Sequence, residues 1–461
     1  MFTEDELEEA GLEWFKELNY STVSGQEISP GGEYPEREDY TEVVLKERLR
    51  DSLYKINNDI PNKAIEDAMR KILIPQEPSL LENNRNFHKM ITDGIDVEYE
   101  RDDGSIKGEK VWIFDKENID NNDWLVVNQF AIKEGKYNRR PDIIVFVNGL
   151  PLVVIELKSA IEEKATIEKA YNKLQNYKRE IPALFTYNEM LIISDGHNAR
   201  VGTITANIER FMPWRSIDGE ELAPAGIPEM EVLIKGVRQK GNFLDLLHHY
   251  ILFQDDSLNI IKIFAAYHQY HAVRKAIGST EKAISDEGDR RIGVIWHTQG
   301  SGKSLSMVFY SGKLVLGLDN PTIVVITDRN DLDDQLFGTF SSSQDLLRQE
   351  PKQADSRKDL RKLLSVESGG IVFTTIQKFE EGDGYIDIYD MTRAVKDEMT
   401  VKIYYESKIV QVDLPEEEKN NLDNEIDNLT ENIVAEEREK YKTRNSALES
   451  VVASDSRLEI V

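Results

Sequence analysis

The chain has 461 residues, no cysteine and a formal net charge of −28. This length predicts two or three domains, and the lack of cysteine excludes disulfides, thiolate metal sites and cysteine nucleophiles. No apolar run is long enough to span a bilayer, and the N-terminus has neither the basic start nor the apolar core of a signal peptide, which predicts a cytoplasmic protein without a membrane partner.

The negative net charge argues against a nucleic-acid partner, because binding to phosphate groups depends on Lys and Arg. The charge is uneven, however, since ten Lys/Arg stand against six Asp/Glu between Lys133 and Arg179, while Pro415–Lys440 is strongly acidic. An acidic protein of this kind can still bind DNA through a local basic groove.

The N-terminal part shows helical patterns followed by strand patterns. Apolar residues at helical spacing predict helices over Asp5–Leu18, Tyr40–Ile56 and Pro61–Ile72. Alternating and β-branched residues then predict strands over Ile95–Tyr99, Lys110–Phe114 and Trp124–Ile132. None of these segments by itself indicates a function.

A hairpin is predicted at Pro141–Lys158, where two apolar runs meet at an Asn-Gly pair. Folding the chain near Gly149 brings Asp142 opposite Glu156. Side chains alternate along a strand, so Glu156 and Lys158 share one face. One end of a buried hairpin therefore presents two carboxylates and an ammonium group.

These three side chains have the chemistry of a metal-dependent nuclease. Carboxylates are ligands that Mg²⁺ prefers, and bound Mg²⁺ lowers the pKa of a water for attack on phosphorus. We predict Asp142 and Glu156 as catalytic metal ligands, and Lys158 as the residue that orients the water or stabilises charge on the phosphate. A surface hairpin with a salt bridge is the alternative, but Glu156 ends the apolar run Leu152–Ile155, where an unpaired charge is costly to bury.

A helix is predicted over Ala160–Arg179, and strands over Met190–Ser194 and Arg200–Ala206 complete an α/β core. On the helix, Lys173 and Tyr177 lie one turn apart, at a spacing that lets both face the active site. Tyr177 is a candidate catalytic residue, with packing in the core as the alternative.

A looser, proline-bearing stretch over Met212–Pro228 predicts a domain boundary, and helical patterns follow at Leu244–Phe253 and Ile260–Ile277. Gln269 lies on the second of these. A glutamine amide can pair with both the N6 donor and the N7 acceptor of adenine, so we predict that Gln269 reads the base, against the alternative of a surface glutamine.

A phosphate cradle is predicted at Ile292–Ser304, where an apolar run (Ile292–Trp296) predicts a strand, a glycine-bearing turn follows, and Leu305–Leu316 has a helical pattern. In such a loop backbone N–H groups surround the β-phosphate, the lysine reaches the β- and γ-phosphates, and the next hydroxyl holds Mg²⁺. A Gly/Ser-rich surface turn is the alternative, and His297 replaces the first glycine of the strict pattern. The predicted ATP-binding residues are Thr298, Gly300, Ser301, Gly302, Lys303 and Ser304, of which Ser304 is also a Mg²⁺ ligand.

Two further buried strands are predicted over Thr322–Thr327 and Ile371–Thr375. Strands that alternate with helices form a parallel sheet whose ligand lies at the carboxyl ends of the strands. Asp328-Arg329 and Thr374-Thr375 end these strands, so nucleotide or DNA is expected beside them.

The acidic pair that such an ATPase needs, one carboxylate for Mg²⁺ and one for the attacking water, does not follow a buried strand anywhere in the sequence. After Phe379 the chain passes through Glu380–Asp383 directly into Gly384-Tyr385-Ile386. We predict that a segment is missing near Glu380–Asp383 and that the chain stops before a second motor domain. The chain alone would then not couple ATP hydrolysis to movement.

Together these motifs resemble the restriction (motor) subunit of type I restriction-modification enzymes. Arg139–Lys158 resembles the nuclease motif of that family, and His297–Ser304 resembles its first helicase motif, in which superfamily 2 helicases and translocases commonly relax the first glycine. Thr327-Asp328-Arg329 and Thr374–Lys378 resemble the next two motifs.

One position departs from the family pattern. The family tends to carry Gln-x-x-x-Tyr on the helix after the nuclease strand. Tyr177 matches this motif, whereas Lys173 stands at the glutamine position, so the resemblance does not carry a role over to residue 173.

The resemblance implies an α/β fold with a PD-(D/E)xK-type nuclease domain over residues 1–228. A RecA-like P-loop superfamily 2 helicase domain, incomplete and with a helical lead-in, would span residues 229–381, and residues 382–461 would lead toward an absent second motor domain. The implied activity is ATP-driven translocation of duplex DNA coupled to Mg²⁺-dependent cleavage of unmethylated DNA away from the recognition site. The implied partners are double-stranded DNA and the modification and specificity subunits, with S-adenosylmethionine bound by the modification subunit only.

Two other hypotheses remain open. A free-standing helicase-nuclease of DNA repair would not bring down a methyltransferase partner. An ATP-gated DNA-binding scaffold with a merely structural hairpin would show no Mg²⁺-dependent cleavage.

Overall fold

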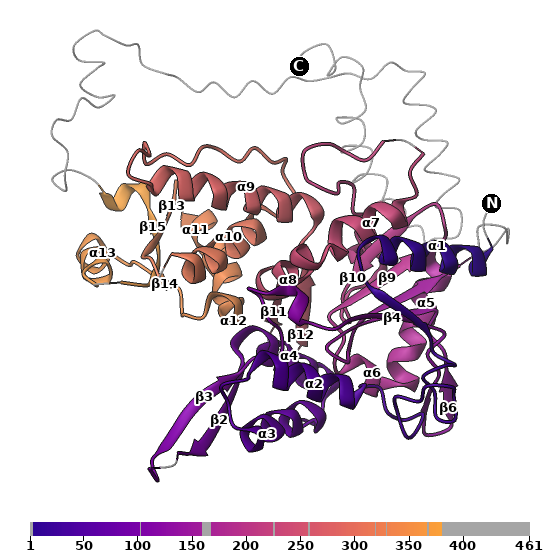
Figure 1. Ribbon diagram of the computed structural model, residues 1–461. Helices are drawn as coiled ribbons and strands as arrows, with labels where there is room; N and C mark the ends of the chain where they lie inside the picture. Colours follow the sequence, from indigo (N-terminus) through magenta and orange to yellow (C-terminus); the bar gives the residue numbers. More distant parts are fainter. Residues whose placement is uncertain are drawn as a thin grey trace, which may run out of the picture. The chain divides into compact units, whose positions relative to one another are not determined.

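The computed structural model describes residues 3–101, 103–158, 167–224, 226–256, 259–318, 320–328, 330–366 and 368–379. The chain forms two compact units, residues 1–380 and 381–461, and all described residues belong to the first. This unit is a mixed α/β structure, in agreement with the predicted class (Figure 1). Residues 382–461, for which a segment after a chain gap is predicted, lie outside the described residues.

A six-stranded mixed sheet lies at the centre of the N-terminal part (Figure 1). In spatial order its strands are β1 (Ser21–Ser24), β4 (Trp124–Asn128), β7 (Ile143–Val147), β8 (Leu150–Leu157), β9 (Met190–Ser194) and β10 (Ala199–Gly202). The outer pair β1–β4 and the inner pair β8–β9 are parallel, and β7 is antiparallel to both of its neighbours. Every residue of β7, β8 and β9 is buried, as expected for strands covered on both faces.

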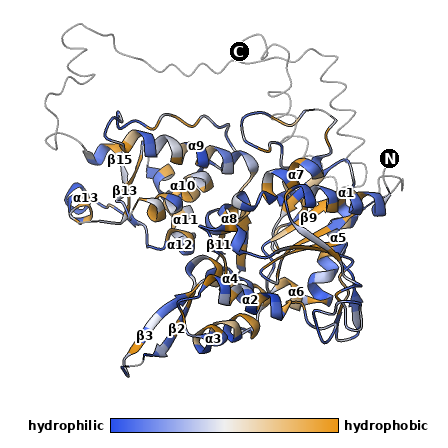
Figure 2. Cartoon of the chain, viewed as in Figure 1, coloured by the Kyte–Doolittle hydropathy of each residue, from blue (hydrophilic) through white to orange (hydrophobic). Residues whose placement is uncertain are grey.

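Helices cover this sheet. α1 (Glu4–Glu17) packs against β1, β4 and β8, and α5 (Ile167–Glu180) packs against β8 and β9. α1 begins with a capping box, in which the Thr3 side chain accepts from the Glu6 N–H and the Glu6 carboxylate accepts from the Thr3 N–H. Figure 2 shows apolar residues concentrated in the strands and charged residues on the outer faces of the helices. The remaining helices of this part are α2 (Lys46–Ile56), α3 (Asn62–Leu73), α4 (Leu80–Asp93), α6 (Pro182–Phe185), α7 (Glu229–Arg238) and α8 (Lys240–His249).

Two small antiparallel hairpins flank the sheet. The first pairs β2 (Ile95–Glu100) with β3 (Ile106–Val111), and the second pairs β5 (Ile132–Glu134) with β6 (Tyr137–Arg139). The single strand predicted over Trp124–Ile132 is thus divided, because Gln129 has a φ of 54° that interrupts extended backbone.

Two helix predictions are wrong in part. The chain after α8 forms a hairpin of β11 (Ile251–Asp256) and β12 (Asn259–Phe264), and the helix α9 starts only at Tyr267 and ends at Ile284. Short apolar runs such as these fit a helix and a strand equally well by periodicity, and pairing between the two runs decides for the strand.

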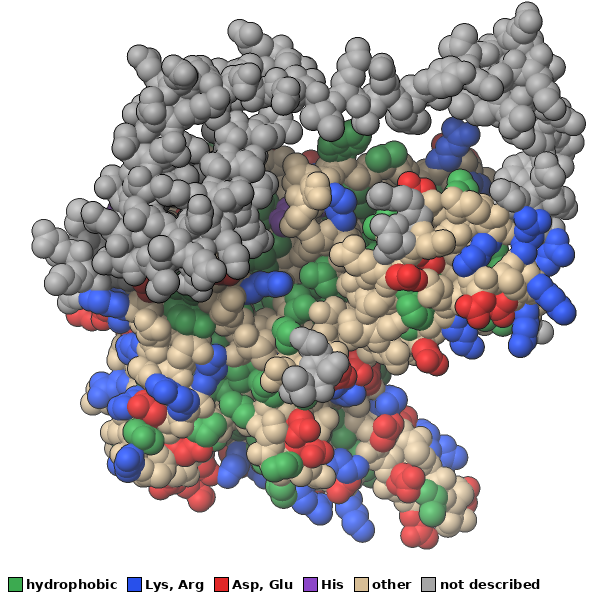
Figure 3. Space-filling model, turned by 180° about the vertical axis from the view of Figure 1, so that it is seen from behind, with side chains coloured by type: hydrophobic (Ala, Val, Ile, Leu, Met, Phe, Trp, Pro, Cys, Tyr) green, Lys and Arg blue, Asp and Glu red, His purple; other side chains and the backbone are tan. Residues whose placement is uncertain are grey.

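The C-terminal part of the described chain contains a three-stranded parallel sheet of order β13-β15-β14, which confirms the predicted parallel arrangement. Figure 3 shows Lys and Arg side chains gathered over α13 at one edge of the molecule. The elements are α10 (Lys303–Gly317), β13 (Ile323–Thr327), α11 (Asn330–Ser341), α12 (Gln344–Leu347), β14 (Lys352–Gln353), α13 (Arg357–Leu364) and β15 (Ile371–Thr375).

The helix α4, which the sequence pattern did not reveal, connects segments that are far apart in the chain. Arg85 bonds to Asp255 and Asp345, and Arg348 reaches back to Asp93. One apolar core runs through the unit, from Leu7 in α1 to Phe373 in β15. No helix of the described chain is long and apolar enough to cross a membrane.

A buried polar cluster joins the six-stranded sheet to β12. Lys262 Nζ lies 2.8 Å from Glu189 Oε2 and donates to Asn84 Oδ1 at 3.0 Å, and His88 Nδ1 lies 2.9 Å from the same Glu189 oxygen. Burial alone would raise the pKa of Glu189, but the charges of Lys262 and His88 hold it below its ordinary value. The cluster fixes β12 to the residue that precedes β9 by charge as well as by apolar packing.

We predict that Gly149→Ala lowers the free energy of unfolding by about 2–4 kcal/mol. Gly149 has a φ of +76°, and an added Cβ would lie 2.3 Å from the Leu45 carbonyl oxygen. Gly135→Ala is the matched control, because Gly135 also has a positive φ (+55°) but open space around it. It should cost only the backbone strain, roughly 1 kcal/mol. Equal losses in chemical denaturation of the two variants would contradict the close approach at Gly149.

Candidate functional site

The β7–β8 hairpin positions the two carboxylates that the sequence singled out. Its two-residue turn has φ values of 52° at Asn148 and 76° at Gly149, as a type I′ turn requires. The Asn148 side chain fixes this turn, because its Nδ2 donates to the Ile113 carbonyl oxygen at 2.7 Å and its Oδ1 accepts from the Asp123 N–H at 2.7 Å.

A β-bulge decides which residues face each other. Next to the turn Val147 pairs with Leu150, a register that would place Asp142 opposite Ile155. The register shifts between Val145 and Phe146, so that Ile143 pairs with Ile155 instead. The next position outward therefore holds Asp142 opposite Glu156, as the sequence predicts.

Both carboxylates are buried. Asp142 is 7 % exposed and Glu156 is 0 % exposed. Asp142 Oδ2 accepts from the Leu157 N–H at 2.7 Å, whereas Glu156 Oε2 has no hydrogen-bond partner among the described residues. Burial raises the pKa of Glu156 well above its usual range, and the nearby charge of Asp142 raises it further.

Two lysines reach these carboxylates. Lys158 Nζ lies 3.4 Å from Glu156 Oε1, and Lys173 Nζ lies 3.5 Å from Asp142 Oδ1 and also forms an ion pair with Glu156 Oε1. Burial alone would lower the pKa of Lys173, but the charges of Glu156 and Asp142 raise it above its ordinary value. The predicted proximity of residue 173 to the hairpin is thus observed, with a lysine at the centre of the cluster.

The helix α1 adds two carboxylates that the sequence reasoning missed. Glu4 Oε1 lies 2.8 Å from Lys158 Nζ. Glu8 accepts from the Asn128 and Gln129 side-chain amides at 2.7 and 2.5 Å. Burial raises the pKa of Glu8, with a smaller contribution from the charge of Asp142. The signal that was available is their spacing of four residues, which places both on one face of a helix.

Tyr177 supports the site from α5. Its side chain is buried, and its hydroxyl donates to the Arg140 carbonyl oxygen at 3.3 Å, just before Asp142. Burial, reinforced by the charges of Glu156 and Asp142, raises the pKa of this phenol, so the side chain is a neutral hydrogen-bond donor. The geometry favours packing and orientation, and a catalytic role stays a prediction.

The cluster fits a divalent cation. The described residues contain no group of three or more His, Cys, Asp or Glu side chains that could hold a metal ion, and this cluster brings together only two facing carboxyl groups, Asp142 and Glu156. A buried carboxylate oxygen without a partner, such as Glu156 Oε2, is costly unless a cation balances it. Glu4 and Glu8 bring two further carboxyl groups to this side of the sheet, close to Lys158 and to the side chains of Asn128 and Gln129.

The predicted phosphate cradle forms a loop that ends at α10. Gly300 and Gly302 have φ values of 80° and 76°, in the left-handed region that glycine adopts without strain. Lys303 folds back over the loop, and its Nζ donates to the carbonyl oxygens of His297 at 3.1 Å and Thr298 at 2.9 Å. Ser301 Oγ also donates to the Thr298 carbonyl oxygen, at 2.8 Å.

The strand predicted before this loop is not present. Residues 291–298 have no regular secondary structure, and Val294 and Trp296 are 87 % and 91 % exposed. A strand needs a neighbour that shares its backbone hydrogen bonds, and none of the sheets in the described residues includes this segment. The prediction of a buried strand over Ile292–Trp296 is therefore wrong.

Gln269 holds the loop in place. Its Oε1 accepts from the Ala266 N–H at 2.8 Å, and its Nε2 donates to the Gly302 carbonyl oxygen at 3.0 Å. The side chain is 4 % exposed, which contradicts the alternative of a surface glutamine. The amide oxygen and the amide nitrogen of Gln269 are both hydrogen-bonded to main-chain groups in this conformation. Recognition of adenine by Gln269 stays a prediction, and it requires these two hydrogen bonds to break.

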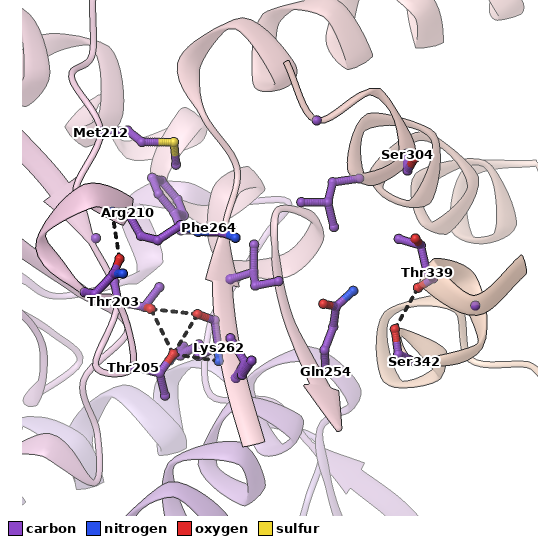
Figure 4. Close-up of a pocket in the computed structure, with 18 residues that line it drawn as sticks. Thr203, Thr205, Arg210, Met212, Gln254, Lys262, Phe264, Ser304, Thr339 and Ser342 are labelled. Carbon is purple, nitrogen blue, oxygen red and sulfur yellow. Dashed lines mark hydrogen bonds between the residues drawn. The ribbon is translucent and has the colours of Figure 1, made fainter. Parts of the chain in front are cut away.

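A cavity of about 660 Å³ lies beside the cradle (Figure 4). One wall carries Gly302 and Ser304, and another carries Thr203 and Thr205, whose hydroxyls donate to the Lys262 carbonyl oxygen at 2.7 and 3.0 Å. Its volume is in the range of small-molecule sites. The segment after β10, the β11–β12 hairpin and the helices α10 and α11 thus enclose a common space.

The strand ends predicted to lie near ligand are adjacent. Thr327 pairs with Thr375 at the carboxyl ends of the parallel strands β13 and β15, and Gln377 Nε2 donates to the Asp328 carbonyl oxygen at 2.9 Å. The described residues contain no acidic pair at the end of a further strand of this sheet. The suspected gap near Glu380–Asp383 lies outside the described residues.

Two family models match this chain. Residues 1–210 match the type I restriction enzyme R protein N terminus, and residues 268–384 and 381–439 match the SWI2/SNF2 ATPase. The first match contains the carboxylate hairpin, and the second contains the phosphate cradle. The second match consists of two pieces that meet at residues 381–384, where the sequence predicts a missing segment.

Curated relatives give the same assignment. The chain is 45% identical over 387 residues to the type I restriction enzyme HindI endonuclease subunit of Haemophilus influenzae, which covers 82% of this chain and 36% of that protein. It is 32% identical over 398 residues to the putative type I restriction enzyme MjaIXP endonuclease subunit of Methanocaldococcus jannaschii, which covers 81% of this chain and 37% of that protein. The chain thus spans little more than a third of the length of these relatives.

A restriction-enzyme domain followed by an SWI2/SNF2-type ATPase region defines a class of restriction subunits that carry an ATPase. The chain belongs to the family of type I restriction enzyme endonuclease subunits.

We predict that the Glu156→Gln variant differs from the native chain in its pH dependence of stability when divalent ions are removed by a chelator. The folded-state pKa of Glu156 is raised. Its contribution to stability is therefore fully present below the ordinary glutamate pKa and is lost as the pH rises. The free energy of unfolding of the variant should therefore rise relative to that of the native chain as the pH increases above the ordinary glutamate pKa of 4.5. Glu168→Gln, at an exposed position of α5, is the control, and a pH-independent difference for Glu156→Gln would contradict the assignment.

Proposed function

We propose that this chain is the nuclease- and ATPase-bearing part of a type I restriction-modification complex. Such a complex uses ATP to translocate duplex DNA and cuts unmethylated DNA away from its recognition site. The observation that carries this proposal is the buried Asp142–Glu156 pair beside Lys158, inside the restriction-enzyme domain, with a Glu156 oxygen that has no partner among the described residues. The modification and specificity subunits are the proposed protein partners, and S-adenosylmethionine would be bound by the modification subunit.

We assign the N-terminal part to the PD-(D/E)xK type of nuclease. Asp142 and Glu156 would hold Mg²⁺, which when bound supplies a water of lowered pKa and positive charge near phosphorus. Lys158 Nζ lies 3.4 Å from Glu156 Oε1, where its ammonium group can orient a water or stabilise charge on the scissile phosphate. Tyr177 holds the main chain at Arg140 and thereby the approach of Asp142 to the site.

We assign the C-terminal part of the described chain to a RecA-like superfamily 2 motor domain. The loop N–H groups from Gly300 to Lys303 and the start of α10 would surround the β-phosphate of ATP. Among the described residues Lys303 donates only to main-chain carbonyl oxygens, so it can turn to the β- and γ-phosphates without breaking an ion pair with any of them. Ser304 would hold the Mg²⁺ of the nucleotide.

We predict that Glu156→Ala abolishes DNA cleavage by the assembled complex but leaves ATP turnover and translocation at their native rates. Asp142→Ala should behave alike, because each change removes one of two metal ligands from the hairpin and none from the cradle. The measurement compares cleavage of unmethylated circular DNA with ATP hydrolysis in the same preparation. Native cleavage rates in either variant would show that the carboxylate pair is not the catalytic site.

A second prediction concerns the cradle. Lys303→Ala should lower ATP turnover by the assembled complex by about 10²–10³-fold, since it removes positive charge from the transferring phosphate. Lys282→Ala, at an exposed position in the last turn of α9, is the control and should hydrolyse ATP normally. Near-normal turnover in Lys303→Ala would refute the cradle assignment.

A further inference from the structure

The ammonium group of Lys173 occupies the place between the two carboxylates. Its Nζ forms an ion pair with Glu156 Oε1 and lies 3.5 Å from Asp142 Oδ1, so it bridges residues from both strands of the hairpin. Lys158 does not share this position. Its Nζ is 3.4 Å from Glu156 and is held by Glu4 Oε1 at 2.8 Å and by the Leu157 carbonyl oxygen at 2.6 Å.

We infer that Lys173 is a resident cation of this site, which neutralises Asp142 and Glu156 in the metal-free protein and which a divalent ion must displace in order to bind. The inference rests on the proposed function, because it takes the two carboxylates as the metal ligands. Lys173 is then a positioning residue that sets how strongly the site binds a divalent ion.

The argument from charge is direct. A lysine ammonium group and a divalent ion are both positive, and both take the same carboxylate oxygens as partners, so they cannot occupy the pair together. With Lys173 in place, Glu156 Oε1 is neutralised, while Glu156 Oε2 remains without a partner among the described residues. The lysine therefore satisfies the site only in part, and a divalent ion that reaches both Glu156 oxygens and Asp142 would satisfy it more fully.

The Lys173 side chain can also move away from the two carboxylates into solvent. Its side chain is 34% exposed, whereas those of Lys158 and Glu156 are 14% and 0% exposed. A lysine on a flexible four-carbon stem can turn its ammonium group to solvent while α5 stays in place. In its present position Lys173 Nζ also lies 5.8 Å from the centroid of the Tyr177 ring, a cation–π contact in addition to the two carboxylates.

A neutral residue at position 173 would act differently. A glutamine amide can donate a hydrogen bond to a carboxylate but brings no charge, so the pair would stay uncompensated and open to the ion. The substitution Lys173→Gln therefore isolates the charge of this residue at a similar side-chain length.

The test is calorimetric titration of Mn²⁺, a spectroscopically useful substitute for Mg²⁺, into the full chain without DNA and without ATP. Lys173→Gln should bind Mn²⁺ more tightly than the native chain by roughly 10–100-fold, the range over which neighbours of metal ligands shift affinity. Lys173→Arg keeps the positive charge and should bind as weakly as the native chain. Lys169→Gln, an exposed position one turn earlier on α5, is the matched control for loss of a charge from the helix.

Thermal unfolding of the same proteins gives an independent readout. Without metal, Lys173→Gln should melt below the native chain, because it loses the ion pair with Glu156, and saturating Mn²⁺ should remove or reverse this difference. A variant that is recovered in folded form only when Mn²⁺ is present would support the inference equally.

Three results would overturn it. Unchanged or weaker Mn²⁺ binding by Lys173→Gln, with the Glu156→Gln variant binding still more weakly, would show that the metal site exists but that Lys173 does not compete for it. If Lys173→Arg also binds Mn²⁺ more tightly than the native chain, the effect comes from the shape of the side chain at position 173 and not from its charge. Equal Mn²⁺ binding by the native chain and by Asp142→Ala and Glu156→Gln would remove the metal site itself, and with it the proposed nuclease function.

Discussion

The geometry of the carboxylate cluster depends on one extra residue in β8. The type I′ turn at Asn148-Gly149 fixes the start of the hairpin, and the bulge that accommodates Leu152 changes the register by one position. Side chains alternate along a strand, so without this bulge Glu156 would leave the face of Asp142 and an isoleucine would take its place. Tight contacts around the turn, from Leu45 and from the Asn148 side chain, hold this register.

A second constraint links the sheet to the segment that leads into the phosphate cradle. Lys262 in β12 is fully buried and reaches Glu189 at the start of β9, while Asn84 and His88 of α4 complete the cluster. The main chain of Lys262 in turn accepts from two threonines that follow β10. Breaking a buried ion pair on one side is costly, so the two parts of the unit are held in one arrangement by a few specific bonds. The cavity next to the cradle lies directly on this connection.

Local sequence patterns predicted much of this structure because the features concerned are local. The helix α1, the hairpin β7–β8 and the parallel strands β13 and β15 follow from periodicity and turn residues close in the chain. The helix α4 escaped prediction because its polar side chains are satisfied by partners 100 or more residues away, such as Asp345 for Arg85 and Glu189 for His88.

The site shows the same division between local and distant information. Strand alternation placed Asp142, Glu156 and Lys158 together, but no local rule states that Lys173 ends between the carboxylates or that Glu4 holds Lys158. These contacts join side chains from different elements, and their geometry depends on how α1 and α5 pack on the sheet. The prediction of a strand before the cradle is wrong for a related reason. An apolar run indicates that a segment can be buried, but it does not say which neighbouring strand would pair with it.

The open apolar segment before the cradle has a consequence for the behaviour of the chain in solution. Val294, Ile295 and Trp296 form a short, exposed, β-prone run that has no regular secondary structure. Such a run is a template for strand pairing between molecules. Self-association of the chain would therefore begin at this segment and increase with protein concentration, and its acidic net charge of −28 would oppose it most strongly at low ionic strength.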